Sequence, residues 1–225
     1  MIKNISNLGD AALYCDFGTE VNKETNSKVI KYFKSLKKKE IQGIINLTPS
    51  YNKLIISFDL KKTHFKEIKK KIENLDVNDN ISEFPKKIEI PICCTDDFSL
   101  DIKRLEEKLS LKREKIYENF FNKEYFCYMT GFIAGMPFLG DLDKNLRANR
   151  LETPRVKVPK GSVGLTEQFA NVYTFESPGG WNIIGNTPVN IFNSNNEENP
   201  VLINPGDEVS FFQITKKEYE KLNEK

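Results

Sequence analysis

The sequence lacks most of the side-chain sets on which familiar active sites are built. His64 is the only histidine among the 225 residues, so the chain alone forms no Ser-His-Asp triad, no Cys-His pair and no multi-histidine metal site. The chain has four cysteines: Cys15, Cys93, Cys94 and Cys127. They form no CxxC pair and have no histidine nearby, which argues against zinc. Lys160-Gly161-Ser162 has the wrong order for a P-loop. We therefore expect no metal site and no Walker A site.

Long apolar runs and an excess of one charge are missing as well. No segment approaches the ~20 apolar residues that a membrane-spanning helix requires. Residues 1–4 lead into ordered-looking sequence without the apolar core of a signal peptide. The 34 Lys and Arg residues are balanced by 32 Asp and Glu residues, and no stretch concentrates positive charge as nucleic-acid-binding proteins do. We therefore expect a cytoplasmic protein that binds neither a membrane nor nucleic acid.

Glycine and proline are scarce in the first 130 residues and common after them. Nine of the 12 glycines and seven of the 10 prolines lie at or after residue 131, whereas 24 of the 34 Lys and Arg residues precede it. A charged, helix-favouring part is thus followed by a turn-rich part, a pattern typical of an α/β domain followed by a mostly β domain. We predict an N-terminal domain over residues 1–86 and a second domain over residues 87–225, with the junction near Phe84-Pro85.

Strand and helix patterns alternate in the first domain. Three segments have the composition of strands: residues 11–17, 41–47 and 54–58. Residues 22–39 carry apolar side chains at helical spacing, and Thr63 can cap a second helix. The order β-α-β-β-α, with residues 88–90 as a candidate last strand, fits a ferredoxin-like α/β sandwich.

The second domain is predicted to begin with a short strand at residues 90–93 and two helices between Ser99 and Asn122. Six short strands separated by turns then follow: residues 125–129, 163–165, 171–175, 181–184, 189–192 and 208–214. Many short strands with regular Gly and Pro between them favour a closed or nearly closed β-barrel.

Three loops of the second domain combine Gly and Pro with larger polar side chains: residues 131–140, 153–164 and 177–188. We call these the three motif loops. Gly and Pro alone are explained by barrel corners, since Gly permits a positive φ and Pro fixes a turn. The same loops also hold five further side chains: Arg155, Lys157, Ser162, Ser177 and the only tryptophan, Trp181. Polar groups that converge beside apolar walls are typical of a small-molecule pocket. From the residues alone, barrel corners and a ligand pocket both stay open.

In their order and spacing, the three motif loops resemble the family that comprises the B-type subunit of 5-oxoprolinase, KipI and allophanate hydrolase subunit 1. The family's runs are approximately GFxPGFxYLG, TPRxxVPxGSVGI and SPGGWxIIGxTP. Residues 204–209 resemble its later PGDxV run, and residues 9–13 and 49–54 fit its N-terminal pattern. Departures also occur: Ser99-Leu100-Asp101-Ile102 keeps only the Asp of the family's Gly-Pro-Asp-Leu, and Phe120 stands where many members have a histidine.

The resemblance implies an α+β protein in which a ferredoxin-like α/β sandwich precedes a cyclophilin-like β-barrel. It also implies a subunit of an ATP-dependent 5-oxoprolinase, an amidohydrolase that opens the small lactam 5-oxo-L-proline to L-glutamate. The partners would be a homologous, KipA-like C-type subunit and a third, lactam-utilisation subunit. ATP would bind this chain or a site shared with a partner subunit. Two alternatives stay open: a KipI-type inhibitor that binds a sensor histidine kinase, and the carboxyltransferase-like half of a urea or allophanate system.

The motif loops supply the site residues that this resemblance implies. Arg155 is expected to hold a carboxylate or phosphate, because a guanidinium offers two parallel donors, and Ser162 is expected to act beside it in catalysis. The expected substrate-binding residues are Ser177, Gly179, Gly180, Trp181 and Thr187. Apolar residues of the first motif loop are expected at a permanent subunit interface, with a core position as the alternative for about half of them: Phe132, Ile133, Met136, Phe138 and Leu139.

Overall fold

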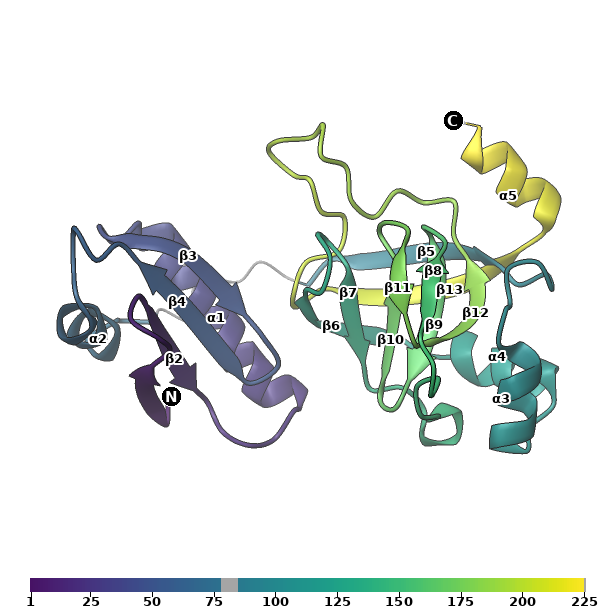
Figure 1. The fold of residues 1–225 in the computed structure, drawn as a ribbon, viewed down its shortest axis with the longest axis horizontal. Coiled ribbons are helices and arrows are strands. Elements are labelled where there is room, and N and C mark those ends of the chain that lie inside the picture. The colour runs from purple at the N-terminus through teal and green to yellow at the C-terminus, as the bar shows by residue number, and fades with distance from the viewer. Residues whose placement is uncertain (78–84, 225) are drawn as a thin grey trace. The chain divides into compact units, whose positions relative to one another are not determined.

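In the computed structural model, residues 1–77 and 85–224 are described, and the chain divides into two compact units, Met1–Phe84 and Pro85–Lys225 (Figure 1). The fold class predicted from the sequence is confirmed: the chain is α+β, with a small α/β sandwich and a closed barrel. Phe84, at the predicted junction, lies outside the described residues. Within the described segments, no helix has the length and apolar character needed to cross a bilayer.

The first unit is a four-stranded antiparallel sheet packed against two helices. Its strands are β1 (Asn4–Asn7), β2 (Ala12–Asp16), β3 (Ile44–Pro49) and β4 (Lys53–Phe58), in the order β1-β2-β4-β3. Helix α1 (Lys23–Lys39) packs on β3 and β4, and α2 (Phe65–Glu73) packs on β2. Alternate residues of β2 and β4 are buried, as expected of strands with one face on a core. The helices bury residues four or seven apart on the same core: Val29, Leu36, Ile68 and Ile72.

The outer strand of this sheet differs from the one that the sequence suggested. The strand order is that of a ferredoxin-like sandwich, but the outer position beside β2 is occupied by β1, with Ile5 opposite Cys15. Gly9 turns the hairpin at a φ of 61°, a conformation that favours glycine. The assignment of residues 88–90 to this sheet is wrong, because β5 (Lys87–Cys93) pairs with the barrel strand β13 (Glu208–Ile214) along its whole length.

Seven strands close the barrel of the second unit. In space their order is β10-β7-β6-β13-β5-β12-β9. The remaining bounds are β6 (Tyr125–Thr130), β7 (Pro137–Gly140), β9 (Ser162–Thr166), β10 (Phe169–Val172) and β12 (Asn182–Asn186). β5 and β13 run parallel, whereas the other neighbours are antiparallel.

Three α-helices accompany the barrel in the described part of the second unit (Figure 1). Helices α3 (Ile102–Leu109) and α4 (Arg113–Phe121) pack on each other and on β12 and β13. The C-terminal helix α5 (Lys216–Asn223) packs on β5 and begins at Thr215. Thr215 and Glu218 hydrogen bond reciprocally there, which satisfies backbone N–H groups at the start of the helix.

Short strands rich in Gly and Pro account for most of the differences from the sequence prediction. β8 (Arg155–Val158) and β11 (Ser177–Gly179) form a separate two-stranded sheet that was not predicted. The strand predicted over residues 189–192 is wrong: this segment is irregular apart from one bridge between Phe192 and Val201. Strands this short hold too few alternating positions to give a sequence signal.

Candidate functional site

The three motif loops meet in one apolar cluster. Met136 comes from the first motif loop, Val158 from the second, and Trp181 from the third, and Tyr173 completes the contact. Trp181 is 8% exposed, and its ring and that of Phe138 form a T-shaped pair with centroids 5.7 Å apart. Trp181 is therefore part of the packing that joins the loops.

A buried carboxylate, that of Asp101 at the start of α3, bonds residues of the second and third motif loops. Asp101 accepts two hydrogen bonds from the Arg155 guanidinium, at 2.9 Å to Oδ2 and 2.7 Å to Oδ1. Its Oδ2 also accepts the backbone N–H of Ile183 at 2.7 Å. The Asp101 side chain is 5% exposed and that of Arg155 is 28% exposed. The fork of Arg155 thus binds a carboxylate, as its chemistry predicts, but the carboxylate belongs to the protein itself.

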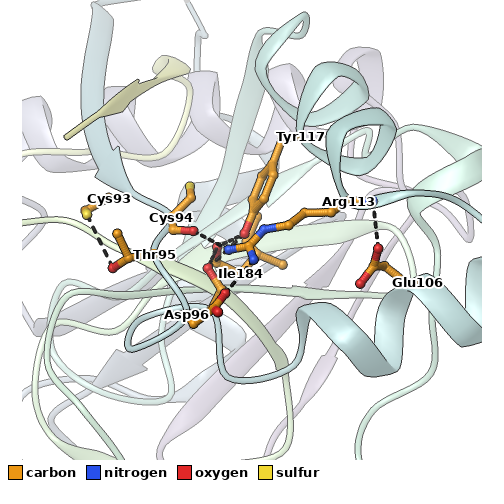
Figure 2. A network of polar contacts seen from close by, with 9 residues as sticks. Cys93, Cys94, Thr95, Asp96, Glu106, Arg113, Tyr117 and Ile184 are labelled. Carbon is orange, nitrogen blue, oxygen red and sulfur yellow. Dashed lines mark hydrogen bonds and ion pairs between the residues drawn. The ribbon is translucent and has the colours of Figure 1, made fainter. Parts of the chain in front are cut away.

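The segment that presents Asp101 is tied to β12 and α4 by a polar network (Figure 2). Ser99 and Tyr117 both donate to the carbonyl of Ile184, at 2.9 Å each. Arg113 pairs with Asp96 and donates to the carbonyl of Cys94 at 2.6 Å. Burial raises the pKa of the Tyr117 hydroxyl, so it stays protonated and able to donate. These bonds hold the backbone before Asp101 in one place.

Gly179 and Gly180 have different surroundings, although they are adjacent in the sequence. A Cβ added to Gly179 would stand 2.1 Å from the Tyr173 hydroxyl, so no side chain fits there. A Cβ on Gly180 would meet nothing closer than 3.5 Å, the distance to Arg150 and Pro154. Gly179 is therefore required by packing against Tyr173, whereas Gly180, although buried, has room for a methyl group.

Tyr173 is a residue of the site that sequence reasoning missed. Burial raises the pKa of its phenol, while hydrogen bonds with the Asn171 side chain and the Trp181 backbone act in the opposite direction. Its main chain bonds Gly161 and Ser162, with N–O distances of 2.7 and 2.9 Å. The only available signal was its position between the second and third motif loops, which does not distinguish it from other core tyrosines.

The predicted site residues fall into two groups around Tyr173. In the β8–β11 sheet, Gly179 is opposite Arg155, and Ser177 is opposite Val158. The Oγ atom of Ser177 is buried and has no hydrogen-bond partner among the described residues.

The second group contains Ser162 and Thr187, which are both buried. Ser162 follows Gly161 in the sequence. The Thr187 N–H donates to the Gly161 carbonyl at 2.9 Å, and its Oγ1 accepts from Val189 N at 3.2 Å. Thr187 therefore has a structural task in the turn.

The apolar residues of the first motif loop are divided between surface and core. Phe132 is 68% exposed, whereas Met136 and Leu139 are buried in the unit. For these last two the core alternative is the correct one. Within residues 1–77 and 85–224, no three His, Cys, Asp or Glu side chains gather as a metal ion would require.

Comparison with known proteins shows which family shares this arrangement. Residues 3–203 match the family described as carboxyltransferase domain, subdomain C and D. The chain belongs to this family. The resemblance seen in its motif loops is confirmed by relatives named as the B subunit of 5-oxoprolinase. The relative from Bacillus subtilis is 31% identical over 98% of this chain and 96% of its own length. The relative from Haemophilus influenzae is 31% identical over 92% of this chain and 96% of its own length.

Among solved structures, this chain resembles the crystal structure of TTHA0988. The two superpose with a TM-score of 0.82 at 26% sequence identity. The alignment covers 91% of this chain and 40% of TTHA0988, so the chain spans less than half of that protein.

Proposed function

We propose that this chain is the B-type subunit of an ATP-dependent 5-oxoprolinase, which opens 5-oxo-L-proline to L-glutamate together with a homologous C-type subunit and a lactam-utilisation subunit. Two observations support the proposal. Relatives with the B-type name are 31% identical over nearly the whole chain. The observation that carries most weight is that Arg155, Ser177 and Gly180 lie on motif loops joined by one packed cluster and one buried ion pair.

Two side chains keep hydrogen-bonding capacity for a substrate. A guanidinium has five N–H donors, and Asp101 takes two of them from Arg155, whose side chain stays partly exposed. In the proposal, the exposed edge of Arg155 binds the carboxylate of 5-oxoproline. The Ser177 hydroxyl, whose oxygen lacks a partner in the described chain, bonds the lactam group.

ATP acts in this proposal as a second substrate, at a site on this chain or shared with a partner subunit. An amide carbonyl is a poor electrophile, so the phosphoryl group of ATP is transferred to the lactam oxygen and ADP leaves. Water then adds to the ring carbon, and the C–N bond breaks with its electron pair going to nitrogen, which takes up a proton. The resulting acyl phosphate is hydrolysed by a second water to the carboxylate and inorganic phosphate.

Association with a partner subunit is part of the same proposal, and this chain is expected to be inactive alone. Exposed apolar side chains in two motif loops are the expected contacts: Phe132 is 68% exposed and Val156 is 81% exposed. A permanent interface should bury more than ~2,000 Å² in total. Val156→Asp should abolish co-elution with the C-type subunit in size-exclusion chromatography. Leu60→Asp, an exposed apolar residue of the first unit, is the matched control and should leave co-elution intact.

The enzymatic test is glutamate release by the reconstituted complex, with and without ATP. Ser177→Ala should lower kcat/KM for 5-oxoproline, because one hydrogen bond to the substrate is lost, by roughly tenfold. Lys157→Gln changes an exposed residue of the same loops, paired only with exposed Glu176, and should leave the rate unchanged. Full activity of Ser177→Ala would show that the assigned role is wrong.

The family description favours one second candidate, the carboxyltransferase-like half of a urea or allophanate system. That function predicts activity with a biotin carboxylase partner and none with 5-oxoproline. Assaying bicarbonate-dependent carboxylation of urea by such a pair separates the two candidates.

A further inference from the structure

A groove of about 410 Å³ lies between α3 and the segment that follows the short 3₁₀ helix η1 (Lys144–Leu146). Its volume falls within the range typical of ligand sites. Eight residues line it: Arg104, Lys108, Leu109, Arg147, Ala148, Asn149, Arg150 and Glu152. Four of these side chains are cations and one is an anion, so the lining carries a net charge of about +3, whereas the whole chain has +2.

The cations of this groove have no ion-pair partner among the described residues. Within the described part of the chain, none of the four forms an ion pair with a carboxylate, although the other two arginines both do: Arg113 pairs with Asp96, and Arg155 with Asp101. Holding like charges together without counter-charges is unfavourable, and the cost is recovered when an anion binds. Arginine is also the side chain best suited to phosphate, because one guanidinium group can donate two parallel hydrogen bonds to two phosphate oxygens.

One of the four cations, Arg104, is held in place by a buried side chain. Arg104 donates to the Oδ1 of Asn182, a fully buried residue that directly follows Trp181. The Nδ2 of Asn182 in turn donates to the carbonyls of Asn149 and Leu165, at 3.1 and 3.0 Å. One amide thus joins both walls of the groove, α3 and the segment after η1, to the third motif loop. A preorganised donor costs less ordering entropy when a ligand binds.

We propose that this groove binds a multiply charged phosphate chain, either free or as part of a nucleotide. The inference gives a place to the phosphates of ATP, whose site the proposed function leaves open, but it rests on the lining of the groove and not on that function. A concave site with four cations from two elements suits a small polyanion better than a flat, extended protein surface. The groove also adjoins the third motif loop directly, since the N–H of Leu151 donates to the Gly180 carbonyl at 2.7 Å and Arg150 lies next to Gly180.

The test is isothermal titration calorimetry of the purified chain with tripolyphosphate, ATP and adenosine at low ionic strength. Tripolyphosphate should bind, binding should weaken as salt is added, and adenosine should not bind. The doubly substituted Arg147→Gln/Arg150→Gln should bind tripolyphosphate at least tenfold more weakly. The matched control, Lys103→Gln/Lys144→Gln, removes two exposed cations outside the groove and should change the affinity by less than twofold.

A further variant is expected to change the affinity in the opposite direction. Glu152→Gln removes the one negative charge of the lining and should tighten tripolyphosphate binding by roughly threefold or more. A damaged fold cannot produce this gain. ATP that binds as tightly as tripolyphosphate would indicate that the phosphate chain suffices, and tighter binding of ATP would identify a nucleotide as the ligand. Absence of tripolyphosphate binding, or equal losses in the groove and control variants, would overturn the proposal.

Discussion

The ion pair between Asp101 and Arg155 should stabilise the barrel unit, and its loss can be measured selectively. Arg155→Ala leaves a carboxylate that is 5% exposed with only one of its three hydrogen bonds, that from Ile183 N. Removing one partner of a buried ion pair costs about 3–5 kcal/mol. Because 28% of the Arg155 side chain is exposed, water can reach part of the vacated space, and we expect the lower end, about 3 kcal/mol.

The assay uses the only tryptophan as a reporter. Trp181 lies in the barrel unit and is 8% exposed, so its fluorescence during urea unfolding follows this unit. Asp101→Asn should cost less than Arg155→Ala, about 1–2 kcal/mol, because Asn keeps an acceptor for Ile183 N and the freed guanidinium can be hydrated. The double variant should be less destabilised than the sum of both singles, with a coupling of at least about 1 kcal/mol.

Lys157→Gln is the control for this cycle, because it removes an exposed cation of the same strand whose ion-pair partner, Glu176, is also exposed. It should change the free energy of unfolding by less than about 0.5 kcal/mol. Additive effects of Asp101→Asn and Arg155→Ala, or an Arg155→Ala variant as stable as the wild type, would show that the ion pair does not stabilise the barrel unit.

Three further predictions concern packing, thiols and helix capping. Gly179→Ala should destabilise the barrel by about 1–3 kcal/mol in the Trp181 assay, because its Cβ meets the Tyr173 hydroxyl, and the adjacent Gly180→Ala should be tolerated; equal losses would contradict the contact. Burial raises the pKa of the Cys15 and Cys94 thiols to about 12, so unfolded thiols ionise near pH 9 while folded ones stay protonated. The free energy of unfolding should therefore fall as the pH rises from about 9 to 12. In a Cys15→Ala/Cys94→Ala variant, this free energy should fall by less over the same interval. Thr215→Ala removes the capping box of α5 and should increase amide exchange in that helix, by an amount corresponding to about 1 kcal/mol, with no change in β13.

Local patterns in the sequence account for much of the fold. The apolar spacing of residues 22–39 corresponds to α1, and the segments 125–129 and 208–214 correspond to β6 and β13. β1 was missed because a four-residue strand with only Ile5 buried has almost no periodicity. Residues 88–90 join the barrel because they pair in parallel with β13, which lies more than a hundred residues away along the chain. No local pattern in the sequence specifies such a partner.

The motif loops were recognisable in the sequence, but the contacts among them were not. The three motif loops do meet, but Asp101, which binds Arg155, is 54 residues away in the sequence and comes from a different segment. Its one signal was that Asp101 alone is retained where the family pattern has Gly-Pro-Asp-Leu. The contact that requires Gly179 to be glycine is equally tertiary, because it is made by the side chain of Tyr173.

An omission experiment tests whether the chain is part of a 5-oxoprolinase. The C-type and lactam-utilisation subunits are incubated with 5-oxoproline and ATP, with and without this chain, and glutamate and ADP are measured. We expect glutamate and ADP in equal amounts only when this chain is present, and no glutamate from this chain alone. Undiminished glutamate release without the chain, or none in the complete mixture, would contradict this expectation.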